Sequence, residues 1–61
     1  MNWTISMTPH ENDSGCVSSI TGKTRSSQGF EVTMTKRFGT PVPPGDAYKV
    51  IMTEINERDL L

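Results

Sequence analysis

The sequence predicts an all-β fold, a small antiparallel sheet of three or four strands; the alternative is an α+β domain with a C-terminal helix on the sheet. Two observations support this prediction. Residues 29–38, GFEVTMTKRF, alternate apolar and polar side chains between two glycines, which is the period of a half-buried strand. An apolar–any–Met–Thr pattern also recurs at 5–8, 32–35 and 50–53, as expected of antiparallel neighbours that each turn one face to a core.

The first expected strand covers residues 3–8. Trp3, Ile5 and Met7 alternate with small polar residues, so they share one apolar face. Pro9 is expected to end the strand because it has no amide hydrogen to donate to a ladder. A polar loop at 10–15 follows, and its glycine suits a turn.

Residues 16–21 are a weaker strand candidate. Val17 and Ile20 are three positions apart, so they do not share a face of a regular strand. The polar segment 22–28, which contains two basic residues, is expected to be a loop.

The central strand contains the expected core. Phe30, Val32 and Met34 share its apolar face, and we expect Val32 and Met34 to be among the most buried residues. Residues 40–46 contain three prolines, which remove donors and fix φ, so this segment is expected to be a stiff connector.

The segment Ala47–Leu61 has two interpretations. As a strand, Tyr48, Val50 and Met52 share one face, and the residue types favour this structure. As a helix, Asp46 would be the N-cap and positions 48, 51, 52 and 55 would form an apolar stripe. Because Tyr, Val, Ile and Thr are poor helix formers, the strand is preferred. Residues 56–61 then form a mobile tail or one helical turn.

The composition indicates that a partner, rather than a disulfide or a metal, stabilises this small domain. The 61 residues form one small domain, 1–61, and a core of this size rarely supplies more than about 3–5 kcal/mol. Cys16 is the single cysteine, which excludes an intrachain disulfide and favours a reducing compartment. His10 and Cys16 do not have zinc-ligand spacing. We therefore expect no metal and no cofactor, and either another protein or a second copy (a homodimer) as partner.

The charge pattern restricts the partner further. The formal net charge is −1 and the pI is about 5.6, which does not favour nucleic acid or a membrane surface. No apolar run has the length of a membrane span or a signal peptide. We therefore expect a cytoplasmic protein for which nucleic acid is an unlikely partner.

No constellation for catalysis is identifiable. Gly22-Lys23-Thr24 matches the end of a phosphate-binding loop, but Val17 stands where that loop requires a glycine. His10 and Cys16 have no identifiable third group that would orient them for nucleophilic catalysis. The seven acidic residues are scattered, as on a solvated surface. We expect the protein not to be an enzyme.

The remaining interpretation is a small protein-binding module that docks on another protein. A chain this short, beginning at Met1 and without catalytic apparatus, is typical of an inhibitor that a phage or mobile element directs at a host protein. The candidate partner-binding residues are the apolar face of the first strand and the basic–aromatic end of the central strand: Trp3, Ile5, Met7, Lys36, Arg37 and Phe38.

The alternative function is a small β-sheet nucleic-acid-binding protein. Single-strand binders combine basic side chains with stacking aromatic rings. The chain contains such residues close together in sequence: Lys23, Arg25, Phe30, Lys36, Arg37 and Phe38.

Overall fold

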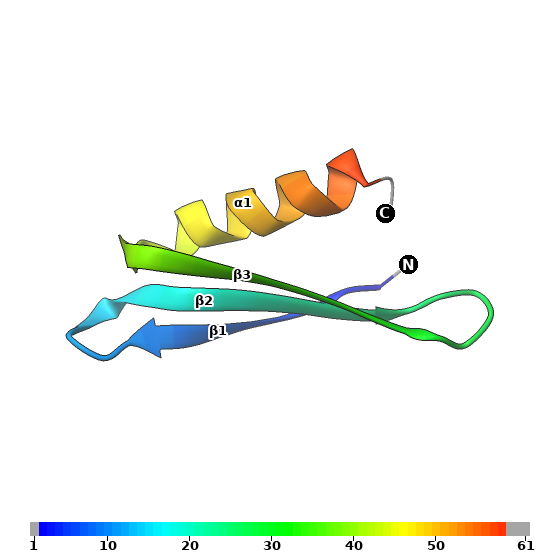
Figure 1. Ribbon diagram of the computed structural model, residues 1–61, viewed down its shortest axis with the longest axis horizontal. Helices are drawn as coiled ribbons and strands as arrows, with labels where there is room; N and C mark the ends of the chain where they lie inside the picture. The colour runs from blue at the N-terminus through cyan, green and yellow to red at the C-terminus, as the bar shows by residue number, and fades with distance from the viewer. Residues whose placement is uncertain (1, 59–61) are drawn as a thin grey trace.

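The computed structural model describes residues 2–58, which form an α+β domain. Strands β1 (Thr4–His10), β2 (Asp13–Arg25) and β3 (Glu31–Val42) form an antiparallel sheet in the order β1-β2-β3. Helix α1 (Pro44–Glu57) packs on one face of this sheet (Figure 1). The molecule is elongated, 40 × 18 × 16 Å. The antiparallel sheet confirms that part of the prediction.

The all-β prediction is wrong because the C-terminal segment forms a helix. Ala47, Ile51 and Ile55 recur every four residues and are fully buried. Burying this stripe outweighs weak helix propensities, which cost at most about 0.7 kcal/mol per ordinary residue. The repeat at 50–53 therefore lies in α1. The repeats at 5–8 and 32–35 lie in β1 and β3, which β2 separates, so they are not strand neighbours.

Two prolines set the start of α1. Pro43 is the N-cap with φ −58° and ψ 144°, and Pro44 occupies the first turn, where a missing amide hydrogen costs nothing. Asp46 was the expected N-cap of the alternative helix. It lies instead in the first turn, where its negative charge favours the helix dipole. The expected connector 40–46 is thus divided between β3 and α1.

The C-terminal end of the chain is only partly described. Asn56 and Glu57, the first residues of the expected tail at 56–61, lie in α1. Residues 59–61 lie outside the described residues.

A bulge in β2 brings Val17 and Ile20 to the same face. Thr8 pairs with Ser19 but Pro9 pairs with Val17, so Ser18 is an extra residue that shifts the alternation by one. The Ser18 hydroxyl donates to the Thr8 carbonyl at 3.3 Å. Both Val17 and Ile20 are therefore buried, which a regular strand would not allow.

The hairpin between β2 and β3 is shorter than the loop predicted at 22–28, because β2 continues to Arg25. Gly29 has φ +89°, and the Ser26 hydroxyl accepts the Phe30 amide hydrogen at 3.1 Å. Phe30 consequently belongs to the turn. Its side chain is 68% exposed, so its predicted place on the apolar face is wrong.

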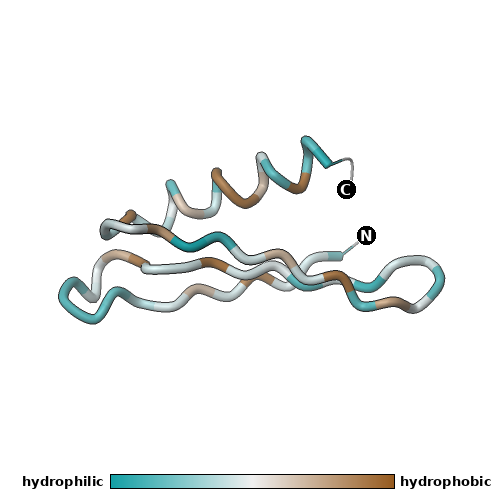
Figure 2. The backbone as a smooth tube through the Cα atoms, in the orientation of Figure 1, coloured by the Kyte–Doolittle hydropathy of each residue, from teal (hydrophilic) through white to brown (hydrophobic). Residues whose placement is uncertain are grey.

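The core lies between α1 and the middle of the sheet. Its buried apolar residues come from β2, β3 and α1: Val17, Ile20, Met34, Ala47, Ile51 and Ile55. Met34 is buried as predicted, whereas Val32 is half-buried. Hydrophobic segments lie along the helix and the strands, and hydrophilic residues gather at the β1–β2 turn (Figure 2).

Gly22 leaves the space that the β1 side chains occupy. A Cβ atom on Gly22 would lie 3.1 Å from Cε3 of Trp3 and 3.2 Å from Cδ1 of Ile5. Both side chains thus cross over β2 at this residue and pack against the core. Close packing of this kind uses glycine for its missing side chain rather than for its backbone freedom.

Candidate protein-docking surface

Helix α1 covers the sheet unevenly. In Figure 1 it lies over β3 and β2, and over most of its length β1 is the strand farthest from it. Trp3, directly before β1, and Ile5, near its start, are half-buried against the core. Met7, farther along β1, is 37% exposed. The helix-side face of β1 is therefore incompletely covered.

The helix contributes a second apolar row beside β1. The Glu54 carboxylate accepts a hydrogen bond from Nζ of Lys36 on β3 at 3.1 Å, which fixes the side of α1 that faces β3. Tyr48 and Met52 lie one turn apart on the opposite side of the buried stripe, and so toward β1. Tyr48 is 46% exposed, and Met52 is half-buried.

These residues define what we call the β1 shelf: Ile5 and Met7 of β1 with Tyr48 and Met52 of α1. An open hollow of about 490 Å³ extends along α1 and is lined by helix residues, among them Tyr48 and Met52. Within the shelf, Met7 and Tyr48 are exposed, while Ile5 and Met52 are half-buried.

The free edge of β1 adjoins the shelf. Strand β1 pairs with β2 on one side and is the outer strand of the sheet. An outer strand presents unpaired amide and carbonyl groups, to which another strand can pair. Pro9 removes one donor near the end of β1. In Thr4–Thr8, by contrast, every residue has both an amide hydrogen and a carbonyl oxygen, so this segment can pair with another strand.

The other outer strand, β3, is less accessible on its helix side. Lys36 and Phe38 point to the helix-covered face, where Lys36 pairs with Glu54 and Phe38 packs against the core. Arg37 points to the opposite face and is exposed. The two predicted partner-binding clusters are thus separated. Ile5 and Met7 lie on β1 with Trp3 directly before it, whereas Lys36, Arg37 and Phe38 divide between the two faces of β3.

Sequence reasoning missed the helical half of the shelf. Tyr48 and Met52 were assigned to a strand face, although their spacing of four is equally that of one helix side. The apolar stripe that the helical alternative included did contain both residues. A correct choice of helix would therefore have pointed to them.

Glu54 links α1 to β3 and has a lowered pKa. The hydrogen bond and charge of Lys36 are the main causes, and partial burial opposes them; Arg58, whose Nε lies 3.5 Å from the Glu54 carboxylate, lowers the pKa further. The carboxylate is therefore stabilised in its charged form in the folded protein.

This pair should make stability depend on acid pH. Because the pKa of Glu54 is lower in the folded than in the unfolded chain, its stabilisation is complete above the ordinary glutamate pKa of about 4.3 and is lost as the pH falls through the lowered value. Urea unfolding between about pH 6 and pH 3 measures this loss. Glu54→Gln and Lys36→Gln should each make the free energy of unfolding less dependent on pH in this range. If both variants kept the pH dependence of the unchanged protein, the Lys36–Glu54 pair would be ruled out as its cause.

Other sites for chemistry are not apparent in residues 2–58. Partial burial and the nearby Asp13 raise the pKa of the Cys16 thiol, which opposes thiolate formation. Within the described range no group of three or more His, Cys, Asp or Glu side chains could hold a metal ion. No helix in this range is both long and apolar enough to cross a membrane.

Comparisons of the chain with protein-family models, curated proteins and solved structures gave no match.

Proposed function

We propose that this protein is a small binding module that docks on an extended segment of another protein along β1. The observation that supports this most is the open edge of β1 beside the β1 shelf. A partner strand that pairs with β1 would extend the sheet. Every second side chain of that strand would then point to the helix side, next to Met7 and Tyr48.

The open edge of β1 and the β1 shelf have different roles in this proposal. Main-chain hydrogen bonds along the edge supply affinity, at about 0.5–1.5 kcal/mol each, while the shelf selects the alternate side chains of the partner. Tyr48 is of the residue type that most often dominates binding energy. Met7 and Met52 can adapt to apolar side chains of varied shape.

A second copy of the chain is one such partner. Two β1 edges that pair antiparallel would join two sheets in an isologous dimer. With a different protein as partner, the module would occlude the strand with which it pairs. Occlusion of this kind is a suitable mode of action for an inhibitor encoded by a phage or mobile element.

Matched variants test the proposal by capture of proteins from a lysate. Met7→Glu and Tyr48→Glu place charge on the shelf, while Val50→Glu, at a position 36% exposed on the β3 side of α1, serves as control. We expect Met7→Glu and Tyr48→Glu to bind the protein that the unchanged chain captures about tenfold or more weakly. Val50→Glu should bind that protein as the unchanged chain does. Sedimentation equilibrium of the three variants tests self-association in the same way.

Two results would contradict the proposal. One is a set of captured proteins that Met7→Glu and Tyr48→Glu retain in full, because docking would then not involve the shelf. The other is an equal loss in Val50→Glu, because the effect would then come from added charge anywhere on the surface.

A further inference from the structure

The face of the sheet opposite α1, which we call the outer face, is polar on all three strands. It consists of the residues that alternate with the core-facing ones, and the strand register places Thr4 opposite Lys23 and Lys23 opposite Thr33. The hydroxyls of Thr21 and Thr35 lie 3.1 Å apart across β2 and β3, which confirms that both point to this face.

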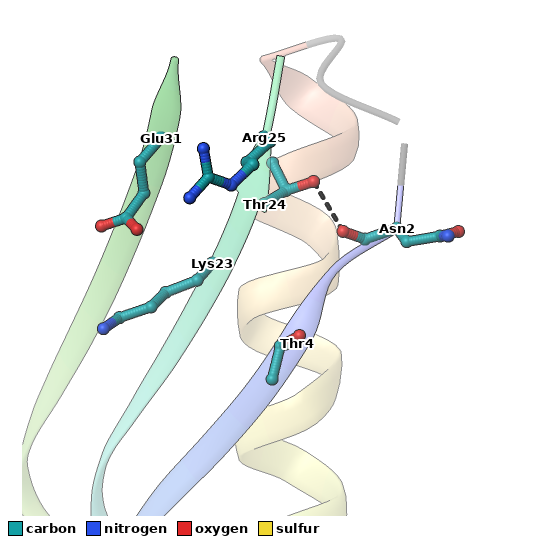
Figure 3. Close-up of a pocket in the computed structure, with 6 residues that line it drawn as sticks. All are labelled: Asn2, Thr4, Lys23, Thr24, Arg25 and Glu31. Atoms are coloured by element: carbon teal, nitrogen blue, oxygen red, sulfur yellow. Dashed lines mark hydrogen bonds between the residues drawn. The ribbon is translucent and has the colours of Figure 1, made fainter. Parts of the chain in front are cut away.

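The outer face is also cationic. Lys23, Arg25 and Arg37 project from β2 and β3, and Glu31 is the acidic residue among them. Figure 3 shows Lys23, Arg25 and Glu31 extending from neighbouring strands, with the Thr24 hydroxyl turned the other way toward Asn2. All five residues, with Thr4, line an open hollow of about 440 Å³. The net charge of −1 conceals this cationic face, because other acidic residues lie on α1, in the β1–β2 turn and at the first residue of β2.

We infer that the outer face binds B-form duplex DNA. Lysine, arginine, serine and threonine are the side chains that commonly contact phosphate oxygens. The charge of the face is thus complementary to a polyanion. A protein partner is less well suited, because the face lacks the aromatic and methionine anchors that dominate protein interfaces.

Duplex is favoured over single strands by the position of the aromatic residues. Single-strand binders stack bases on aromatic rings. Trp3 and Phe38 lie on the helix side of the sheet and pack against the core, and Phe30 lies in the hairpin. The outer face therefore has no stacking platform among the described strand residues.

Access to the major groove favours B-form DNA over an RNA duplex. The B-DNA major groove is about 12 Å wide and admits two strands at about 4.8 Å spacing, so the side chains of β2 and β3, which carry the cations, can enter it. The major groove of an A-form helix is too narrow for side chains to enter. Because the β1 shelf lies on the opposite face, a docked protein and DNA can be bound at the same time.

Fluorescence anisotropy of a labelled mixed-sequence DNA duplex of about 16 bp tests the inference. With three cations at phosphates, log K should fall with log salt at a slope of about −2 to −3, so that affinity drops about 15- to 65-fold between about 50 and 200 mM salt. Lys23→Gln and Arg37→Gln should each reduce the slope by about one. Glu31→Gln removes an opposing charge and should tighten binding several-fold.

Controls separate duplex DNA from other polyanions. Lys49→Gln, at an exposed position on α1, should leave binding unchanged. The matching RNA duplex, the single strand and polyglutamate should each compete weakly. Absent binding at 50 mM salt, equal weakening in Lys49→Gln, or equal competition by single strands or polyglutamate would each overturn the inference.

Discussion

Ile51→Ala should lower the free energy of unfolding by about 2–5 kcal/mol. Ile51 is fully buried at the centre of the helix stripe, between Ala47 and Ile55. A domain of this size has only about 3–5 kcal/mol of net stability. The variant should therefore be partly or wholly unfolded at room temperature, which urea titration followed by circular dichroism would show.

The neighbouring residue provides the matched control. Val50 is 36% exposed on the other side of α1, and alanine is the better helix former. Val50→Ala should therefore change the free energy of unfolding by no more than about 0.5 kcal/mol. Equal destabilisation by the two substitutions would mean that the helix has a different buried side.

Gly22→Val should lower the free energy of unfolding by about 1–3 kcal/mol. Even its first added carbon would lie 3.1–3.2 Å from the side chains of Trp3 and Ile5, and the two methyl groups of valine need further space. The side chains of β1 would have to leave their positions over β2. Urea unfolding measures the loss, and the fluorescence of Trp3 should report its displacement.

Gly39→Val is the control for this substitution. Gly39 also lies in a strand, but a Cβ atom there meets nothing within 4 Å. Valine suits strands better than glycine, so Gly39→Val should be neutral or slightly stabilising. If Gly22→Val were as stable as Gly39→Val, the close packing of β1 over Gly22 would be refuted.

The strands could be predicted from sequence where the alternation is regular. The period-two pattern of residues 3–8 and 29–38 located β1 and β3, and it identified Met34 as a core residue. The predicted strand ends were wrong, because β1 continues through Pro9 to His10 and β3 continues to Val42. It failed at Val17 and Ile20, because the bulge at Ser18 changes the alternation within β2. A bulge of this kind has no period of its own, so periodicity cannot reveal it.

The helix was missed because two patterns overlap in the same segment. Tyr48, Val50 and Met52 alternate as in a strand, while Ala47, Ile51 and Ile55 recur as on a helix. Residue propensity favours the strand only weakly, and tertiary burial of the second set decides the structure. Pro44 at the helix start was read as a mark of a connector, although proline is also favoured in the first helical turn.

The candidate surfaces were predictable only in part. Trp3, Ile5 and Met7 could be grouped from their spacing, but their relation to Tyr48 and Met52 depends on the position of α1 over β2 and β3. The cationic outer face could not be found from the net charge. It depends on the register that places Lys23 beside Thr33 and Arg37 beside Ser19.

Docking along β1 is tested most directly by amide hydrogen exchange measured by NMR across Thr4–Thr8. In the free protein every second amide of β1 should face the open edge and exchange rapidly, while those between are protected by pairing with β2. When the captured protein is added to saturation, the open-edge amides should slow by about tenfold or more, and the open-edge amides of β3 should not change. Unchanged exchange along β1 in the complex would contradict the account.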